Sequence, residues 1–317
     1  MLRAIKTWVG IDLAKKSFDV AGLAGRSVRS LPNTSAGHQQ LIKQLPAPGT
    51  CLIVVESTGG YERVLVAALA MAGHLVAVVN PRQVRDFARS QGILAKTDRI
   101  DALVIARFGE VTQPLPQVYE EDQAYLQALI ARRRQLVEHR AAELNRRQQT
   151  GFADVAKSVQ LSIDAAGKEI KRLDKKILAL VQSHDDWRER FERAQTVPGV
   201  GDTIAAAIVS ELPELGQLNR QKIASLVGLA PMNRDSGQHR GRRHIQGGRG
   251  GIRQLLYMGA LTGIRFNPVI RRTYRRLRAK GKTFKVAITA CMRKLLVILN
   301  TMFRNRTNWG EHAPACL

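Results

Sequence analysis

The chain has 317 residues, 44% of them hydrophobic, which is enough for two or three domains with real cores and excludes a wholly disordered protein. Lys and Arg number 50 against 26 Asp and Glu, so the formal net charge is +24. Only an extended polyanion or an anionic membrane surface readily neutralises an excess of this size.

The sequence gives no sign of a membrane span or of an oxidising compartment. The longest apolar run, residues 64–79, is broken at Gly73–His74 and is shorter than the ~20 residues that cross a bilayer. The segment Met1–Lys6 lacks the apolar core and cleavage site of a secretory signal. The cysteines, Cys51, Cys291 and Cys316, have no metal-ligand spacing. We therefore expect a cytoplasmic, nucleoid-associated protein with reduced thiols and no membrane partner.

Residues 1–113 predict an α/β domain, because short β-rich runs alternate with amphipathic helical runs. A hairpin is expected at the start of the chain, followed by a buried central strand and a further strand, with a helix between them and a last helix at the end. The expected strands are Trp8–Asp12, Phe18–Leu23, Cys51–Val55 and Leu75–Val79, and the expected helices are residues 62–72 and a segment from Thr97–Asp98 to Phe108.

Four acidic residues in this domain are candidate metal ligands. Asp12 and Glu56 follow two strands whose carboxyl ends share one edge of the predicted sheet, where α/β folds place their sites. Asp98 and Asp101 lie three residues apart on one helical face. Carboxylate oxygens are the ligands that Mg²⁺ selects, and two such ions would hold both oxygens of a phosphoryl displacement.

Each of these acidic residues has another interpretation. Asp98 and Asp101 also fit the cap of a helix, which stabilises its first turn without any metal. Asp19 is a possible fifth carboxylate, although its alternation with Phe18 and Val20 favours an ordinary exposed strand position. The order strand-Asp, strand-Glu, helical Asp-x-x-Asp is nevertheless that of the RuvC-like members of the RNase H-like fold.

Residues 114–194 predict two long helices that form a coiled-coil hairpin, because leucine, isoleucine and valine recur there at spacings near three and four. Gly151 is a plausible turn between them. The hairpin serves either as a rigid spacer or as an oligomerisation arm, and the sequence does not decide between the two.

Residues 195–317 predict a mainly α domain with a helix-hairpin-helix-like element. Pro198-Gly199-Val200-Gly201 precedes an expected helix at Ile204–Leu212. Glycines at such a turn let backbone amides approach a phosphate at the helix N-terminus, so Gly199 and Gly201 are candidate nucleic-acid contacts. A simple interhelical loop uses the same residues.

The C-terminal segment is strongly basic and contains a candidate nucleophile. Residues 231–317 hold nineteen Lys or Arg and two Asp or Glu, which is +17 of the total charge and predicts DNA binding. Ser236 lies in an Asp-Ser-Gly sequence that is by itself a common turn. The arginines that flank it, Arg234, Arg240, Arg242 and Arg243, favour either scissile-phosphate binding or plain backbone binding. Arg249, in the glycine-rich run that follows, is a further candidate nucleic-acid contact.

A second basic stretch follows. Arg271–Arg272 and Arg275–Arg276 recur around Tyr274 at helical spacing and predict a basic face with one aromatic side chain for stacking or packing.

Taken together, these motifs resemble the Piv/MooV-like insertion-sequence transposases, a family with an N-terminal DEDD RuvC-like domain and a C-terminal serine domain that includes bridge-RNA-guided recombinases. The resemblance covers nearly the whole chain. The matching passages are Val9–Asp12, Val55–Tyr61, Lys96–Ala102, Val197–Gly201 and Gly228–Pro231 leading to Ser236–Gly237.

The resemblance implies a function for each matched residue. Asp12, Glu56, Asp98 and Asp101 become the ligands of Mg²⁺, for which Mn²⁺ can substitute, and Ser236 becomes the nucleophile that joins a DNA end. The implied partners are donor and target double-stranded DNA, a guide or bridge RNA from the element itself, and further copies of the chain in a dimer or tetramer. The implied reaction is insertion and excision of a mobile element.

Two other functions remain open on the sequence. One is a metal-dependent Holliday-junction-type endonuclease, in which water attacks and the basic domain only holds the junction. The other is a nucleic-acid-binding factor with a decayed catalytic domain, against which the presence of all four carboxylates argues.

Overall fold

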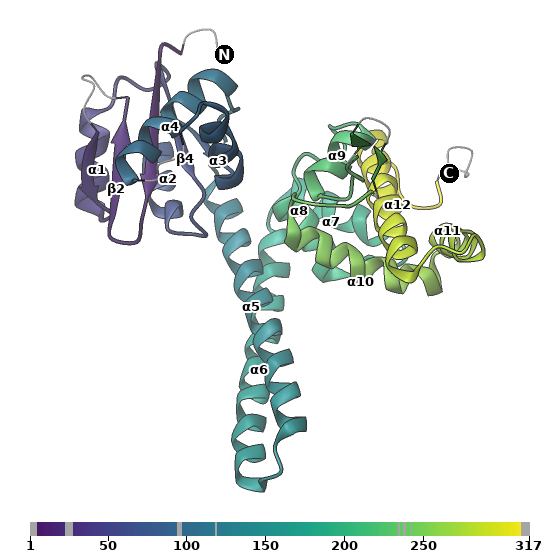
Figure 1. Cartoon of the computed structure of the whole chain (residues 1–317). Helices are drawn as coiled ribbons and strands as arrows, with labels where there is room; N and C mark the ends of the chain where they lie inside the picture. Colours follow the sequence, from purple (N-terminus) through teal and green to yellow (C-terminus); the bar gives the residue numbers. More distant parts are fainter. Residues whose placement is uncertain are drawn as a thin grey trace. The chain divides into compact units, whose positions relative to one another are not determined.

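The computed structural model of the chain forms two compact units, Met1–Glu121 and Asp122–Leu317 (Figure 1). The structure describes residues 5–22, 28–93, 97–117, 119–233, 235–236, 239–241 and 243–311. Asp98, Arg99, His239 and Arg240 are described by their backbone only.

The first unit contains a five-stranded mixed sheet in the order β3-β2-β1-β4-β5. Its strands are β1 (Thr7–Leu13), β2 (Ser17–Ala21), β3 (Arg29–Pro32), β4 (Cys51–Glu56) and β5 (Leu75–Val79). The first three strands are antiparallel neighbours, whereas β1, β4 and β5 run parallel. The predicted hairpin, central strand and last strand are confirmed. The sequence did not predict β3, because only Leu31 of its four residues is buried.

Helices cover both faces of this sheet, which explains why β4 is apolar along nearly its whole length. On one face, Leu41 of α1 (Ser35–Gln44) and Leu65 of α2 (Glu62–Met71) pack on the odd-numbered residues of β1 and β4. On the other face, α3 (Pro81–Ser90) and α4 (Asp98–Thr112) pack on the even-numbered residues of β4. Helices α2 and α4 were predicted; α1 and α3 were not.

Helix α4 runs antiparallel to β1 and lies unusually close to it. A Cβ atom on Gly10 would lie only 2.3 Å from the carbonyl oxygen of Ala102, near the start of α4. A Cβ atom on Gly109, near the end of the helix, would lie 2.6 Å from Val54 and 3.4 Å from Trp8. The N-terminus of α4 is therefore directed toward the carboxyl ends of β1 and β4.

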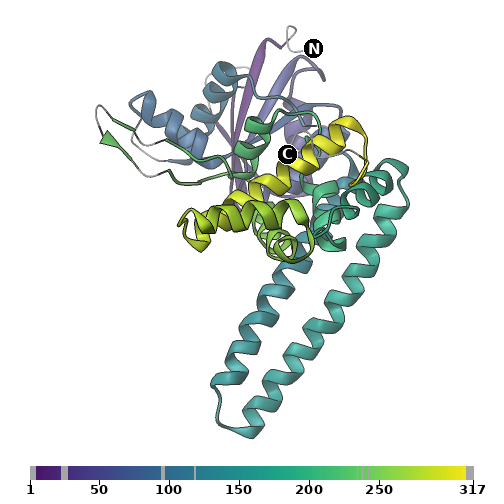
Figure 2. The same cartoon turned by 90° about the vertical axis from the view of Figure 1, so that its right-hand side faces the viewer.

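The second unit begins with two long helices, α5 (Glu121–Gln149) and α6 (Ala153–Gln182), which run side by side in opposite directions (Figure 2). Pairs across the helices show the antiparallel alignment: Arg133 with Asp174, His139 with Ser162 at 3.1 Å, and Arg147 with Gln160. The predicted pair of long helices is confirmed, and Gly151 lies in the turn between them.

The rest of the second unit is mainly helical, as predicted. It contains α7 (Asp185–Gln195), α8 (Asp202–Glu211), α9 (Arg220–Val227), α10 (Gly250–Phe266), α11 (Pro268–Ala279) and α12 (Phe284–Asn305), with a short hairpin of β6 (Asp235–Ser236) and β7 (His239–Arg240). Helices α8 and α12 supply much of its core.

Helix α12 is the one helix in the described part of the chain that is long and apolar enough to cross a membrane. Within the unit it is a core helix, because 61% of its apolar window is buried and it packs on α7, α9, α10 and α11. It also carries the cations Arg293 and Lys294.

Candidate functional site

Asp12 and Glu56 are neighbours at the carboxyl edge of the two central strands. The parallel register of β1 and β4 ends at the pair Ile11 and Val55. Asp12 follows Ile11 on β1, and Glu56 follows Val55 on β4. Both side chains are half-buried. The expectation that Asp12 and Glu56 lie at one carboxyl edge of the sheet is therefore confirmed for their backbone positions.

The same edge faces the start of α4. Side chains two residues apart on a strand share a face of the sheet. Asp12 therefore lies on the face where Gly10 contacts α4, and Glu56 lies on the face where Val54 contacts α4. Because α4 runs antiparallel to β1, its first turns lie toward this edge, and Asp101 on the second turn is half-buried. Asp98 is the first residue of the helix, but its carboxylate lies outside the described side chains.

The helix cap is Thr97 rather than Asp98. The backbone N–H of Ile100 donates to the Thr97 hydroxyl at 3.3 Å, which satisfies one of the free donors of the first turn. The residue that caps the helix is therefore Thr97, and Asp98 is the first residue of the helix.

Among the side chains that the structure describes, no three His, Cys, Asp or Glu form a group that could hold a metal ion. The side chain of Asp98 is not among those that the structure describes. The candidate ligands at this edge that the structure describes, Asp12, Glu56 and Asp101, are carboxylates, which is the chemistry that fits Mg²⁺ or Mn²⁺.

Asp19 occupies a different position from the exposed one that its alternation favours. It is the register partner of Asp12 across β1 and β2, and its side chain is half-buried. Directly opposite residues of an antiparallel pair share a face, so Asp19 adds a further carboxylate beside the candidate metal ligands.

Glu62, which the sequence analysis missed, fixes the loop that follows Glu56. Its buried carboxylate accepts hydrogen bonds from the backbone N–H and hydroxyl of Thr58 at 3.2 and 2.9 Å and from the N–H of Gly60 at 2.8 Å. Burial by itself raises the pKa of Glu62, but these hydrogen bonds outweigh it and hold the pKa below its ordinary value. The only sequence signal was a glutamate at the start of a helix.

The glycines of the loop between α7 and α8 have different environments. Gly199 has φ +106°, and a Cβ there would lie 2.6 Å from the carbonyl oxygen of Gly259 in α10. Its absence of a side chain is thus required for close packing within the unit. Gly201 is exposed, is the N-cap of α8 and has open space around its Cα. Phosphate binding by either glycine stays a prediction.

Ser236 lies exposed in the short β6–β7 hairpin, where His239 is its register partner. Next to it, the Asp235 carboxylate accepts hydrogen bonds from Arg243 at 2.8 and 2.7 Å. Arg243 is therefore held against the hairpin by an ion pair. Of the other predicted arginines of this loop, Arg234 and Arg242 lie outside the described residues, and Arg240 is described by its backbone alone.

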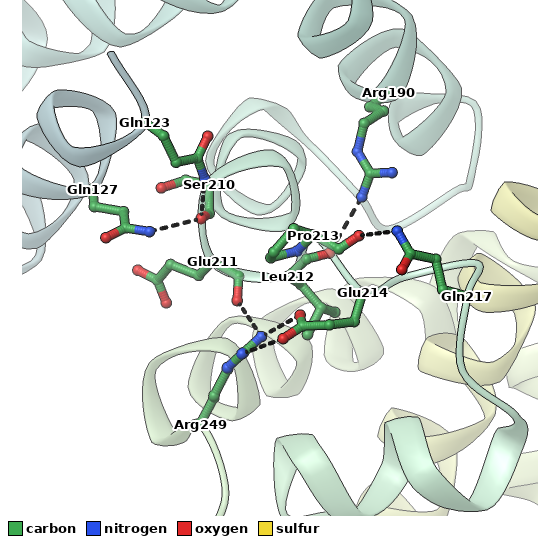
Figure 3. A network of polar contacts seen from close by, with 10 residues as sticks. All are labelled: Gln123, Gln127, Arg190, Ser210, Glu211, Leu212, Pro213, Glu214, Gln217 and Arg249. Carbon is green, nitrogen blue, oxygen red and sulfur yellow. Dashed lines mark hydrogen bonds and ion pairs between the residues drawn. The ribbon is translucent and has the colours of Figure 1, made fainter. Parts of the chain in front are cut away.

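Arg249 is engaged inside the second unit (Figure 3). Its guanidinium forms a bidentate ion pair with Glu214 at 2.6 and 2.5 Å and donates to the carbonyl of Glu211 at 2.8 Å. Burial raises the pKa of Glu214, but the hydrogen bond from Arg249 contributes to a net lowering. Any nucleic-acid contact by Arg249 must compete with this pair.

Comparison with known proteins connects both units to transposases. Residues 9–150 match a family profile described as "Transposase" that is named for a DEDD domain, and residues 191–275 match the profile "Transposase IS116/IS110/IS902 family". The chain is 30% identical to the pilin gene-inverting protein of Moraxella bovis over 94% of its own length and 96% of that relative. The chain belongs to the IS116/IS110/IS902 transposase family.

Other relatives of this transposase family come from insertion elements. The "Insertion element IS900 uncharacterized 42 kDa protein" of Mycobacterium paratuberculosis is 26% identical over 94% of the chain and 96% of its own length. An IS110 protein of Streptomyces coelicolor is 30% identical over 52% of the chain and 41% of its own length.

Membership of the IS116/IS110/IS902 family assigns the chain a recombinase activity on DNA, and its DEDD domain implies a divalent metal. The first profile covers the carboxylate edge of the sheet, and the second covers the hairpin with Ser236. The resemblance seen in the sequence motifs is thus confirmed at the level of the family.

Proposed function

We propose that this transposase excises and inserts a DNA segment by strand cleavage and rejoining, with Mg²⁺ or Mn²⁺ held by Asp12, Glu56, Asp98 and Asp101 and with Ser236 as the nucleophile. The observation that carries the proposal is the adjacency of Asp12 and Glu56 at a sheet edge toward which the start of α4 is directed. A protein acting on chromosomal DNA in this way would work at the nucleoid.

In the proposed site the four carboxylates share one locality, where their like charges would favour binding of a divalent cation. When bound there, a divalent metal supplies positive charge that neutralises the phosphate undergoing displacement. Glu62 has a supporting role in this proposal, because it holds the loop from Thr58 to Gly60 that begins two residues after Glu56.

The proposed covalent step conserves the number of phosphodiester bonds. The Ser236 oxygen attacks the scissile phosphorus, a bond from phosphorus to a DNA oxygen breaks, and a phosphoserine diester forms. The serine proton passes to a base, and the departing DNA oxygen gains a proton to become a hydroxyl. Attack by a hydroxyl of another DNA end reverses these steps and restores the serine, so that no energy source is consumed.

The two halves of the proposed active site lie in separate units of the chain: Asp12 and Glu56 in the first, Ser236 in the second. We propose that they meet between subunits of a homo-oligomer, a dimer or a tetramer. The net charge of +24 also suits a guide RNA that pairs with donor and target DNA, as the family resemblance implies. RNA sequencing of the purified protein tests that partner directly.

The Moraxella bovis relative is named as an inverting protein, which favours inversion as a second outcome of the same chemistry. Cleavage and rejoining at two sites gives inversion or excision according to the relative orientation of the sites. Plasmids that carry the element ends in direct and in inverted orientation distinguish the two products.

The metal requirement is tested by strand cleavage on a plasmid that carries the element ends. We expect cleavage with Mg²⁺ or Mn²⁺, and none from Glu56→Gln or Asp101→Asn although both remain folded. Asp86→Asn is the matched control, because Asp86 is an exposed carboxylate of the same unit that only forms surface ion pairs with Arg82 and Arg89. Full cleavage in EDTA would contradict the proposal.

The reaction product distinguishes the endonuclease alternative from the proposed serine mechanism. A water nucleophile leaves free DNA ends, whereas Ser236 leaves a protein–DNA adduct that survives denaturation. Efficient cleavage with no adduct at any time during the reaction would favour the endonuclease.

A further inference from the structure

The second unit has a cavity of about 550 Å³ between the start of α9, the outer face of α11 and one face of α12. Helices α11 and α12 pack on each other, and the cavity opens beside their contact. It is lined by Arg220, Gln221, Val269, Arg272, Thr273, Arg276, Leu277, Ala290, Arg293, Lys294 and Val297.

The lining is unusual in its charge. It includes five cationic residues and, among the residues that line it, no carboxylate. The cations come from three helices: Arg220 from α9, Arg272 and Arg276 from α11, and Arg293 and Lys294 from α12. Burial, and then the nearby charges of Arg276 and Arg272, lower the pKa of Lys294 from its ordinary value, which shows that the cations repel one another at this site.

Not every arginine of α11 belongs to this cavity. Arg271 donates to the carbonyl of Ile264 at 3.3 Å, and Arg278 donates to the carbonyl of Lys282 at 2.7 Å, so both hold neighbouring turns of backbone. Tyr274 packs edge-on against Phe284 and, partly buried, against the core of the unit. Arg272 and Arg276, one helical turn apart, are the two that face the cavity.

Cations gathered in one cavity repel one another, and an anion bound there would offset that repulsion. The aliphatic side chains of Val269, Leu277 and Val297 in the lining lower the local dielectric and strengthen both the repulsion and any attraction to an anion. An anion that presents several charges in a row relieves the repulsion of all five cations at once, and a nucleic-acid strand is such an anion.

We infer that the cavity between α9, α11 and α12 is a binding site for consecutive backbone phosphates of a nucleic-acid strand, separate from the Ser236 hairpin. The inference deepens the proposed function and rests on it, because it names the surface that holds the strand while cleavage occurs elsewhere. DNA and RNA share the phosphodiester chemistry that the cavity recognises, and the probes below distinguish them.

The test compares two double variants of the full-length chain. Arg272→Gln with Arg276→Gln removes two charges from the cavity. Arg275→Gln with Lys280→Gln removes two charges from the same stretch of chain, at exposed residues that do not line the cavity. Anisotropy of a labelled duplex DNA and of a labelled single-stranded RNA of equal length, titrated at several salt concentrations, gives the affinity and its salt dependence.

For the strand that the cavity holds, we expect the cavity variant to bind at least about tenfold more weakly at low salt, because two charge-assisted contacts are lost. Its slope of log affinity against log salt should be smaller by about 1.8 for duplex DNA or about 1.4 for single-stranded RNA. The control variant should retain affinity within about twofold, since charges without direct phosphate contacts act only through the screened field.

Equal losses in the two variants, or no loss with either probe, would overturn the inference. Thermal melting checks that the cavity variant is folded. We expect it to melt no lower than wild type, because removing two cations reduces the repulsion among the charges that line the cavity. If it is unfolded, Arg293→Gln with Lys294→Gln, which removes two cations of α12, must show the same selective loss. Normal cleavage at saturating DNA by a weakly binding variant would uphold the proposed function independently.

Discussion

Asp19 lies directly opposite Asp12 in the antiparallel pairing of β1 and β2. Two carboxylates at such positions share one face of the sheet, and like charges placed directly opposite each other are destabilising. A divalent metal bound at Asp12 would therefore also act on the charge of Asp19.

The first prediction concerns Asp19→Asn. In EDTA, where no metal offsets the repulsion between Asp12 and Asp19, the variant should melt at a higher temperature than wild type. With Mg²⁺ the difference should shrink, because the metal compensates for the charge of Asp19 in the wild-type protein only. If Asp19→Asn raises the melting temperature by the same amount with and without Mg²⁺, the charge of Asp19 does not interact with a bound metal. Asp86→Asn, on the exposed surface of α3, should shift neither value.

The second prediction uses the hydrogen bonds of Glu62. Its pKa is lowered in the folded state, so its contribution to stability is present above the unfolded pKa of about 4.3 and is lost as pH falls through the lower folded value. Glu62→Gln should therefore lower the free energy of unfolding by about 1–3 kcal/mol at pH 7. This gap should narrow as the pH falls below 4.

Urea unfolding of wild type and Glu62→Gln at neutral and acid pH measures the gap. A gap that stays constant over this range would mean that the ionised carboxylate is not what holds the Thr58–Gly60 loop. Glu110→Gln is a matched control, because Glu110 forms an exposed pair with Arg107 one turn away and should contribute little at any pH.

The strand and helix framework around the candidate site was predictable from the sequence, because period-two and period-3.6 patterns depend on burial that neighbouring residues share. The positions of Asp12 and Glu56 followed from the ends of two apolar strands. Register was not predictable in detail, and this is why Asp19 was interpreted as an ordinary exposed residue although β2 places it beside Asp12.

Residues whose function depends on tertiary contacts could not be assigned from the sequence. In the sequence, a glycine that lets a phosphate approach the backbone cannot be distinguished from one that lets another helix pack closely. The backbone of α10 beside Gly199 shows that this glycine packs against a helix. Likewise, Arg271 and Arg272 are adjacent in a basic run, yet one holds the backbone of α10 and the other lines the cavity. The ion pair of Arg249, which the sequence marks only as a candidate nucleic-acid contact, could not be predicted because its partner, Glu214, lies far from it in sequence.

The third prediction concerns that ion pair. Arg249→Ala should destabilise the second unit by about 1–3 kcal/mol, because it leaves the half-buried Glu214 carboxylate without its bidentate donor. Arg249→Lys should recover only part of the loss, since a lysine ammonium cannot donate in the bidentate geometry. If Arg249 instead serves DNA alone, Arg249→Ala will melt like wild type and bind DNA more weakly. Melting and anisotropy on the same preparations separate these outcomes.

The fourth prediction concerns Ser236. Ser236→Ala should bind DNA with unchanged affinity, because the hydroxyl contributes no charge, yet it should leave no protein–DNA adduct on a denaturing gel. Ser225→Ala is the control, since Ser225 is an exposed serine of α9 outside the hairpin and should form the adduct normally.

A mixing experiment then asks whether the two halves of the site come from different subunits. Ser236→Ala retains the carboxylates of the first unit, and Asp101→Asn retains the serine of the second, so neither recombines alone. If each active site combines one subunit's carboxylates with another's serine, a mixed oligomer contains sites in which both halves are intact, and partial recombination activity should return. If the halves belong to one subunit, every site in the mixture lacks one of them and activity should stay absent. Recombination by Ser236→Ala alone at the wild-type rate would contradict the assignment of this serine altogether and favour attack by water at the carboxylate edge.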